Sequence, residues 1–339
     1  MFQLNQNTKI YIIAPTDYFN GGAELLHQLC DVMRRNHLNA YMCYYNKTRD
    51  CYEKVNLPQH LEGYVLKTVR AIEDSAENLL IVPEKCTQPL RKYNEIQKCL
   101  WWLGVNNYFW YSEIYGYYSM AVFVYHWLNY FRGKCTPMFF GEIKKMNIQH
   151  LSQCWYGVAF LQKKGIHNVA YLSDYINGVH EDYRPTGMDR KDIILYNPKR
   201  NPKYIRAIKR RDKELHFVPV KNMTSQQVAE IMKQAKLYVD FGSHPGKDRM
   251  PREAVLHGCC ILTSTMGSAD FWDDVPIDSE FKFVRSRNSI DCVIEKIHDI
   301  LENYSNYTYR FDSYRKYVCS EKDKFEQDVL KIFNYESRL

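Results

Sequence analysis

The sequence predicts an α/β fold made of two doubly wound domains. Short strand-like runs alternate with helix-like segments along most of the chain, and a polar segment containing Pro and Gly, residues 181–191, interrupts this alternation once. The length of 339 residues is consistent with two domains of the usual ~150 residues each. We therefore expect two Rossmann-like domains that face a cleft. In sheets of this kind ligands bind beyond the carboxyl ends of the strands, which is where we expect the ligand site.

The first domain is expected over residues 1–183. It opens with a short β-branched run, residues 9–14, whose length and composition are typical of a buried strand. A turn-rich stretch with Gly21 and Gly22 follows, and apolar residues at helical spacing then predict a helix. The expected elements are strands over 9–14, 39–45, 78–83, 98–103 and 150–155, and helices over 23–35 and 158–164.

The second domain is expected over residues 184–314, where the alternation of strands and helices restarts. Thr224 or Ser225 is a suitable cap for one of its helices. The expected strands cover 193–196, 215–218, 237–240 and 260–263, and the expected helices cover 202–210, 225–234, 252–257 and 290–302. A closing helix is expected over 315–333.

Composition and charge exclude several classes of protein. Hydrophobic residues make up 45% and charged residues 25%, and no apolar run reaches the ~18 residues of a membrane span. The amino terminus has no signal-peptide pattern, so we expect a cytoplasmic protein. Eleven cysteines without a CxxC pair favour reduced, mostly buried thiols over a zinc ribbon or a disulfide framework. The net charge of +7 suits an anionic ligand or membrane; nucleic acid is not expected, because the basic residues are dispersed and no recognised module is visible.

The stretch over residues 237–269 carries the most information about function. It reads as strand, glycine-containing loop, helix, small-residue turn, strand and second glycine-containing loop. Gly242 and Gly246 let backbone amides approach a phosphate, and the helix that follows offers free N–H groups. Glu253, one turn into this helix, is placed to hold a ribose hydroxyl. Positive charge that we expect to be mobile comes from Lys247, Arg249 and Arg252. Together these are the parts of a nucleotide-diphosphate site.

This segment also resembles a known family. The residues that carry the likeness are Pro251, Glu253, Ala254, Gly258, Thr263 and Gly267. In their order and spacing they resemble the C-terminal domain of GT-B glycosyltransferases, especially retaining, family-4-like enzymes of bacterial surface polysaccharide synthesis. The resemblance implies that Glu253 binds the donor ribose and that the turn with Gly267 and Ser268 lies near the diphosphate. It also implies that the last segment, 315–339, packs back towards the first domain.

Two further loops are similar to loops of that family. The turn around Gly21 and Gly22 resembles the first βα loop, which implies a position facing the sugar and the phosphates. The residues after the strand over 193–196 resemble the basic pair that grips the diphosphate. The residues that would bind the nucleotide or its diphosphate are then Gly21, Gly22, Lys199, Arg200, Lys203, Arg249, Glu253, Gly267 and Ser268.

The sequence departs from the family pattern at two places. The family carries two glutamates eight positions apart, but Pro245 stands eight before Glu253. His244 and Asp248 flank this gap and are the candidates for a catalytic role in its place. The basic pair is also irregular, because Lys199 and Lys203 are four apart rather than five. No catalytic base is evident, and a retaining transfer, which the resemblance implies, needs none.

An aromatic stretch over residues 108–131 has two interpretations. Twelve of its 24 residues are Tyr, Phe or Trp, and Arg132 and Lys134 follow. It is either an acceptor-side or membrane-touching element, since Tyr and Trp favour interfaces and basic residues favour anionic headgroups, or a pair of helices with an ordinary aromatic core. Its polar residues exclude a membrane span. Asp17 and Asn107, at the ends of first-domain strands, are candidates for the acceptor side.

The sequence therefore predicts a metal-independent glycosyltransferase without a cofactor. Its partners would be a nucleotide sugar as co-substrate, a glycan or lipid-linked acceptor and, through peripheral contact, the inner face of a membrane. No Asp-x-Asp motif is present, and Asp273 and Asp274 lie in an expected turn. A non-catalytic nucleotide- or glycan-binding protein on the same fold is the main alternative, favoured by the missing glutamate. A dinucleotide-dependent oxidoreductase or epimerase is disfavoured, because the Gly-x-Gly-x-x-Gly fingerprint is absent.

Overall fold

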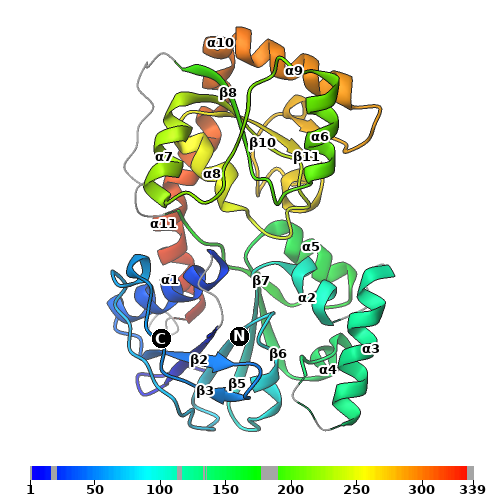
Figure 1. The fold of residues 1–339 in the computed structure, drawn as a ribbon. Coiled ribbons are helices and arrows are strands. Elements are labelled where there is room, and N and C mark those ends of the chain that lie inside the picture. Colours follow the sequence, from blue (N-terminus) through cyan, green and yellow to red (C-terminus); the bar gives the residue numbers. More distant parts are fainter. Residues whose placement is uncertain are drawn as a thin grey trace. The chain divides into compact units, whose positions relative to one another are not determined.

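The chain divides into two compact units in this computed structural model, which describes residues 2–16, 21–112, 117–132, 134, 136–176 and 190–333 (Figure 1). For 110–112 and 117–123 it describes the backbone alone. The first unit comprises Met1–Asp174 with Asp323–Leu339, and the second comprises Tyr175–Lys322. Most of the expected linker, residues 181–191, lies outside the described residues.

The first unit is built on a seven-stranded sheet in the order β3-β2-β1-β4-β5-β6-β7. All neighbours are parallel except β2 and β3. The strands are β1 (Ile10–Pro15), β2 (Ala40–Asn46), β3 (Cys51–Tyr52), β4 (Leu79–Pro83), β5 (Gln97–Trp102), β6 (Ile148–Ser152) and β7 (Val169–Tyr171). The helices are α1 (Gly21–Arg35), α2 (Val105–Ser112), α3 (Tyr117–Phe131), α4 (Phe140–Lys145) and α5 (Trp155–Lys163).

Burial explains why the first strands of this unit read as continuous apolar runs. Every residue of β1 and of β4 is buried, as expected for parallel strands covered on both faces. Ile12 pairs with Met42 of β2 on one side and with Ile81 of β4 on the other, so β1 is central. The strand order reverses between β1 and β4, which makes their carboxyl ends the switch point of this sheet.

The second unit has a five-stranded, fully parallel sheet in the order β12-β11-β10-β8-β9. The strands are β8 (Lys191–Tyr196), β9 (Phe217–Pro219), β10 (Ala235–Asp240), β11 (Cys260–Ser264) and β12 (Lys282–Phe283). The helices are α6 (Pro202–Arg211), α7 (Ser225–Gln234), α8 (Arg249–Leu256), α9 (Ile290–Glu302), α10 (Tyr304–Thr308) and α11 (Asp312–Phe333), of which the part from Asp323 onward belongs to the first unit. Figure 1 shows α6 and α9 on one side of these strands and α7 and α8 on the other. The order reverses between β8 and β10, which is the switch point of this sheet.

Several elements begin elsewhere than the sequence predicts. Helix α8 starts at Arg249, one turn before the expected 252, because Pro251 is tolerated in a first turn, where its missing N–H has no helical partner. The run expected as a strand over 150–155 ends as β6 at Ser152, and Trp155 already begins α5. The Cys154 sulfur accepts from the Gly157 N–H at 3.3 Å and caps that helix. The capping of α7 by Thr224 is as expected.

Most described cysteines are buried free thiols, as the sequence predicts; Cys292 and Cys319 are exposed. Among the described residues, no helix has both the length and the apolar character needed to cross a membrane.

Candidate functional site

The second unit brings two predicted loops together at its switch point. Arg200 follows β8, while Asp240 ends β10 and Asp248 precedes α8. The Arg200 guanidinium donates to Asp240 Oδ1 at 3.3 Å and to Asp248 Oδ2. Burial opposes the charge of this guanidinium, but the two carboxylates prevail and raise its pKa above its usual value. The parallel topology therefore places a paired cation where such sheets bind ligands.

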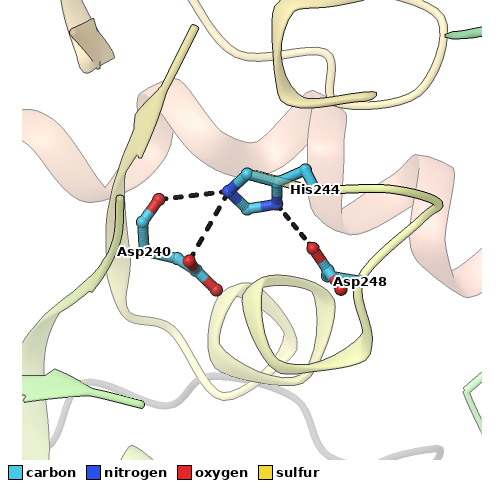
Figure 2. Close-up of side chains that lie close together, drawn as sticks. All are labelled: Asp240, His244 and Asp248. Carbon is cyan, nitrogen blue, oxygen red and sulfur yellow. Dashed lines mark hydrogen bonds and ion pairs between the residues drawn. The ribbon is translucent and has the colours of Figure 1, made fainter. Parts of the chain in front are cut away.

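His244 contacts the same two aspartates (Figure 2). Its Nδ1 lies 2.7 Å from Asp248 Oδ2, and its Nε2 lies 3.1 Å from the Asp240 carbonyl oxygen and 3.6 Å from Asp240 Oδ1. Burial alone would lower the pKa of His244, but Asp240 and Asp248 outweigh it and raise the pKa above 6.5. Burial likewise opposes ionisation of Asp248, and Arg200 and His244 together lower its pKa.

The predicted catalytic pair is thus one hydrogen-bonded unit. His244 is only 1% exposed, whereas Asp248 is 27% exposed, so of the two Asp248 offers more surface to a ligand. The His244 backbone is left-handed, with φ of +41°. Because a residue other than glycine is strained there, the contacts of its ring help to hold the loop in this conformation. A direct part of either side chain in chemistry stays a prediction.

Asp240, His244 and Asp248 also have the donor atoms for a metal ion, since one ligand atom of each lies within 4.8 Å of the others. The Arg200 guanidinium already contacts both carboxylates, so a divalent cation would face a fixed positive charge. The geometry favours Arg200 as the cation of this cluster, and metal independence stays a prediction.

Two of the three cations expected to be mobile are fixed instead. Lys247 Nζ donates to Glu321 Oε1 of α11 at 2.5 Å, and Arg252 Nη1 donates to Glu321 Oε2 at 2.7 Å. Lys247 and Arg252 have side chains only 1% exposed, and Glu321 only 4%. The prediction of mobile charge was wrong for both, because a buried carboxylate from a distant helix neutralises them.

Arg249 and Glu253 form a second pair of predicted site residues, on the first turns of α8. Arg249 Nε lies 3.3 Å from Glu253 Oε1, and their side chains are 21% and 11% exposed. Glu253 is therefore not the exposed carboxylate that an ordinary surface helix would show. Lys199, in the loop before α6, and Lys203, in the first turn of α6, are exposed.

The turn after β11 contacts the loop that carries His244. The Ser268 N–H donates to the His244 carbonyl oxygen at 2.9 Å, and Ser268 Oγ donates to the Gly246 carbonyl oxygen at 2.7 Å. Gly267 has φ of +65°. Of the predicted residues in the first unit, Gly21 and Gly22 begin α1, and Asn107 lies in the first turn of α2. Asp17 lies outside the described residues.

Sequence reasoning missed one residue at the switch point of the first sheet. Glu84 directly follows β4, is 3% exposed, and accepts from the Leu103 N–H at 2.9 Å. Burial raises the pKa of this carboxyl to about 7, although the Leu103 N–H works in the opposite direction. The signal in the sequence was an acidic residue immediately after an apolar strand, at the edge where ligands bind.

Replacing Glu84 by glutamine is expected to stabilise the protein at alkaline pH. The pKa of this carboxyl rises from 4.5 to about 7 on folding. The free energy of unfolding is therefore unaffected below pH 4.5 and decreases as the pH rises from there through about 7. The full loss is roughly 3 kcal/mol, at about 1.4 kcal/mol per pKa unit. Unfolding midpoints at pH 5 and pH 8 test this, with the exposed Glu77→Gln as the matched control. A difference between variant and wild type that does not change with pH would contradict the prediction.

Comparison with known proteins identifies the fold. No protein-family model matches the sequence, and no curated protein matches it either. Among solved structures, the chain is similar to Anabaena HepE in complex with UDP and glucose, with a TM-score of 0.59 and 12% identity over 98% of this chain and 100% of the other. This chain has the GT-B fold. WaaG, a glycosyltransferase involved in lipopolysaccharide biosynthesis, is similar with a TM-score of 0.54 and 11% identity over 95% and 99% of the chains.

A third GT-B structure, sucrose-phosphate synthase from Thermosynechococcus elongatus, matches with a TM-score of 0.54 and 11% identity over 98% of this chain and 96% of the other. The expected GT-B fold of two Rossmann-like domains is therefore confirmed. Identities of 11 to 12% establish the fold alone. What a GT-B chain does must be argued from its site.

Proposed function

We propose that the protein is a glycosyltransferase that moves a sugar from a nucleotide diphosphate to a glycan or lipid-linked acceptor. The observation that carries this proposal is the group of charged side chains around β8, β10 and α8, at the switch point of a GT-B second unit. The guanidiniums of Arg200 and Arg249 are partly exposed, and guanidinium is a preferred group for phosphate oxygens.

Each predicted site residue takes a role in this proposal. Glu253 accepts from a ribose hydroxyl, and Lys199 and Lys203 add charge beside the diphosphate. Gly267 and Ser268 shape the neighbouring turn. In the first unit, Gly21 and Gly22 face the sugar and phosphates, and Asp17 and Asn107 are on the acceptor side. The amino terminus of α8 adds N–H groups and a positive dipole end for the same anion.

The transfer breaks the bond between the anomeric carbon and the diphosphate oxygen and forms one to an acceptor hydroxyl oxygen. In a retaining reaction without a metal, the departing diphosphate oxygen takes the acceptor proton, and Arg200 and Arg249 stabilise the charge that develops on it. Asp248, held by Arg200 and His244, is the group of the predicted catalytic pair with more exposed surface.

The biological setting follows from the acceptor. WaaG serves lipopolysaccharide biosynthesis, and we propose a comparable role in surface polysaccharide synthesis here. A lipid-linked acceptor would place the enzyme on the cytoplasmic side of a membrane, in peripheral contact with its inner face. A non-catalytic nucleotide- or glycan-binding protein is the second candidate, because Pro245 stands where the family has its first glutamate.

Thermal unfolding with UDP, GDP, CMP, dTDP, ADP and NAD, with and without magnesium, tests the proposal. One nucleoside diphosphate that raises the midpoint independently of magnesium supports it and names the donor base. Sugar transfer from the matching nucleotide sugar then separates an enzyme from a binding protein. Stabilisation by NAD alone would contradict the proposal and favour a dinucleotide-dependent oxidoreductase instead.

Replacing Arg249 or Glu253 by alanine is expected to weaken nucleoside diphosphate binding by about 1–3 kcal/mol, the usual range for a charge-assisted hydrogen bond. Isothermal titration calorimetry of each variant measures this. Arg210→Ala is the matched control. Arg210 is exposed and lies in the last turn of α6, at the end of the helix away from the site. Unchanged affinity in both site variants would remove the basis for the site assignment.

A further inference from the structure

The last two turns of α3 have the opposite polarity from a water-facing helix. Asn129, a polar residue, is only 5% exposed, whereas Tyr125 is 63% and Phe131 69% exposed. Trp127 is 47% exposed. A water-facing helix normally buries its apolar side chains and presents polar ones, so this reversal indicates an interaction surface on the outer face.

The exposed apolar side chains form one stripe along the helix. Val124, Trp127, Leu128 and Phe131 fall at the spacing of a single helical face, and all are exposed. The rings of Trp127 and Phe131 meet edge to face at 4.7 Å. Tyr130 lies off this stripe, where its ring contacts Phe139 at 5.8 Å, just before α4. Figure 1 shows α3 at the edge of its unit, away from the sheet.

Charge around the stripe is positive. Arg132 and Lys134 follow it directly and are exposed, and α4 ends in two further lysines. Between residues 117 and 146 the sequence has one acidic residue, Glu142. Its carboxylate is held by Arg91, with Nη2 to Oε2 at 2.6 Å, so it does not offset the other cations.

We propose that this surface, Val124, Tyr125, Trp127, Leu128, Phe131 and Arg132, docks on an anionic phospholipid bilayer. The helix lies in the plane of the interface, with its aromatic rings at the headgroup level and its cations on lipid phosphates. This proposal specifies the membrane contact of the proposed function. The biological role of the docking rests on that function, but the docking itself does not, because binding to lipid requires neither donor nor acceptor.

Two other arrangements explain the exposed apolar side chains of α3 less well. The 15 residues of α3 reach roughly 22 Å at ~1.5 Å per residue, too short for the ~30 Å hydrocarbon core, so the helix does not span it. A second copy docked on the same face would bring two surfaces of the same positive charge together, which costs free energy.

Co-sedimentation of the full chain with vesicles tests the proposal. The vesicles are phosphatidylcholine alone and an equimolar mixture with phosphatidylglycerol. The wild type is expected to bind the mixed vesicles, and Trp127→Ser or Phe131→Ser is expected to lower binding about tenfold each. The double variant Arg132→Gln, Lys134→Gln is expected to lose the preference for the anionic vesicles, at roughly fivefold per charge. Trp272→Ser, at a tryptophan 57% exposed in the second unit, is the matched control.

The proposal fails if the wild type does not bind either vesicle, or if Trp127→Ser and Phe131→Ser bind as the wild type does. A concentration-dependent dimer that Phe131→Ser abolishes would also overturn it, in favour of a second copy. Leu128→Gln, at another exposed position, serves if a serine variant does not fold. The nucleoside diphosphate shift of each variant is measured in parallel. A variant that keeps this shift and loses vesicle binding separates lipid docking from the proposed transfer.

Discussion

Replacing Glu321 by alanine is expected to lower the free energy of unfolding of the second unit by about 3–5 kcal/mol. The carboxylate pairs with Lys247 Nζ at 2.5 Å and with Arg252 Nη1 at 2.7 Å, and all three side chains are at most 4% exposed. Without it, two buried cations lose the charge that offsets their desolvation. Lys247 keeps its hydrogen bond to Tyr317 Oη at 3.0 Å, which replaces only part of the lost interaction.

Equilibrium unfolding in urea measures this loss, with Asp323→Ala as the control, since Asp323 is exposed on the same helix. Equal losses in the two variants would show that the helix, and not the ion pairs, is responsible. Replacing Lys247 and Arg252 by methionine together with Glu321→Leu is expected to recover most of the stability, because a packed apolar group avoids desolvating charge. Failure of that recovery would indicate that the three charges are needed to specify the local packing.

This ion-pair group also explains how the site loop is held. Lys247 lies beside Asp248 in the sequence, and the Arg252 guanidinium donates to the carbonyl oxygens of Lys247 and Asp248 at 3.2 and 3.3 Å. The loop that carries Asp248 is therefore held in place by Glu321 of α11 through Lys247 and Arg252. Arg200 and His244 hold the Asp248 carboxylate. The side chains that remain partly exposed are Arg200, Asp248 and Arg249, which are the ones we assign to the ligand.

The parts of the fold that depend on local pattern could be predicted from the sequence. The apolar run that became β1 and the alternation of strands and helices are periodic signals, and parallel topology then brings the loops after β8 and β10 to one edge. This is why Arg200, from the loop after β8, contacts Asp248, from the loop after β10 that also carries His244. Strands of two or three residues, such as β3, β7 and β12, are too short for a periodic signal.

Interactions between distant segments could not be predicted in the same way. Glu321 is 74 residues from Lys247, and no local pattern says which helix packs under the loop. The burial of Glu84, which raises its pKa, likewise depends on segments distant in the sequence, among them the end of β5, where the Leu103 N–H donates to its carboxylate. For α3, the sequence left a membrane-touching element and an aromatic core equally open, because periodicity gives the faces of a helix and not which of them is covered.

Replacing Gly267 by alanine is expected to cost roughly 2–5 kcal/mol, from left-handed strain and steric overlap together. A Cβ there would lie 2.0 Å from the His244 carbonyl oxygen and 2.4 Å from that of Ser243, and φ is +65°. Both neighbours are backbone atoms, so the turn and the loop must separate. The hydrogen bond from the Ser268 N–H to the same His244 oxygen, at 2.9 Å, would be strained or lost.

Thermal unfolding and nucleoside diphosphate titration of Gly267→Ala measure two separate consequences. Gly141→Ala is the matched control, since a Cβ at Gly141 meets nothing within 4 Å, and we expect it to stabilise α4 by about 0.5–1 kcal/mol. A variant as stable as the control would show that the turn can move away from His244 at little cost. Lower stability with unchanged nucleotide affinity would mean that this turn braces the His244 loop without reaching the diphosphate. Loss of both is expected if, as the proposed site requires, the turn braces the loop and shapes the anion site through the same backbone contacts.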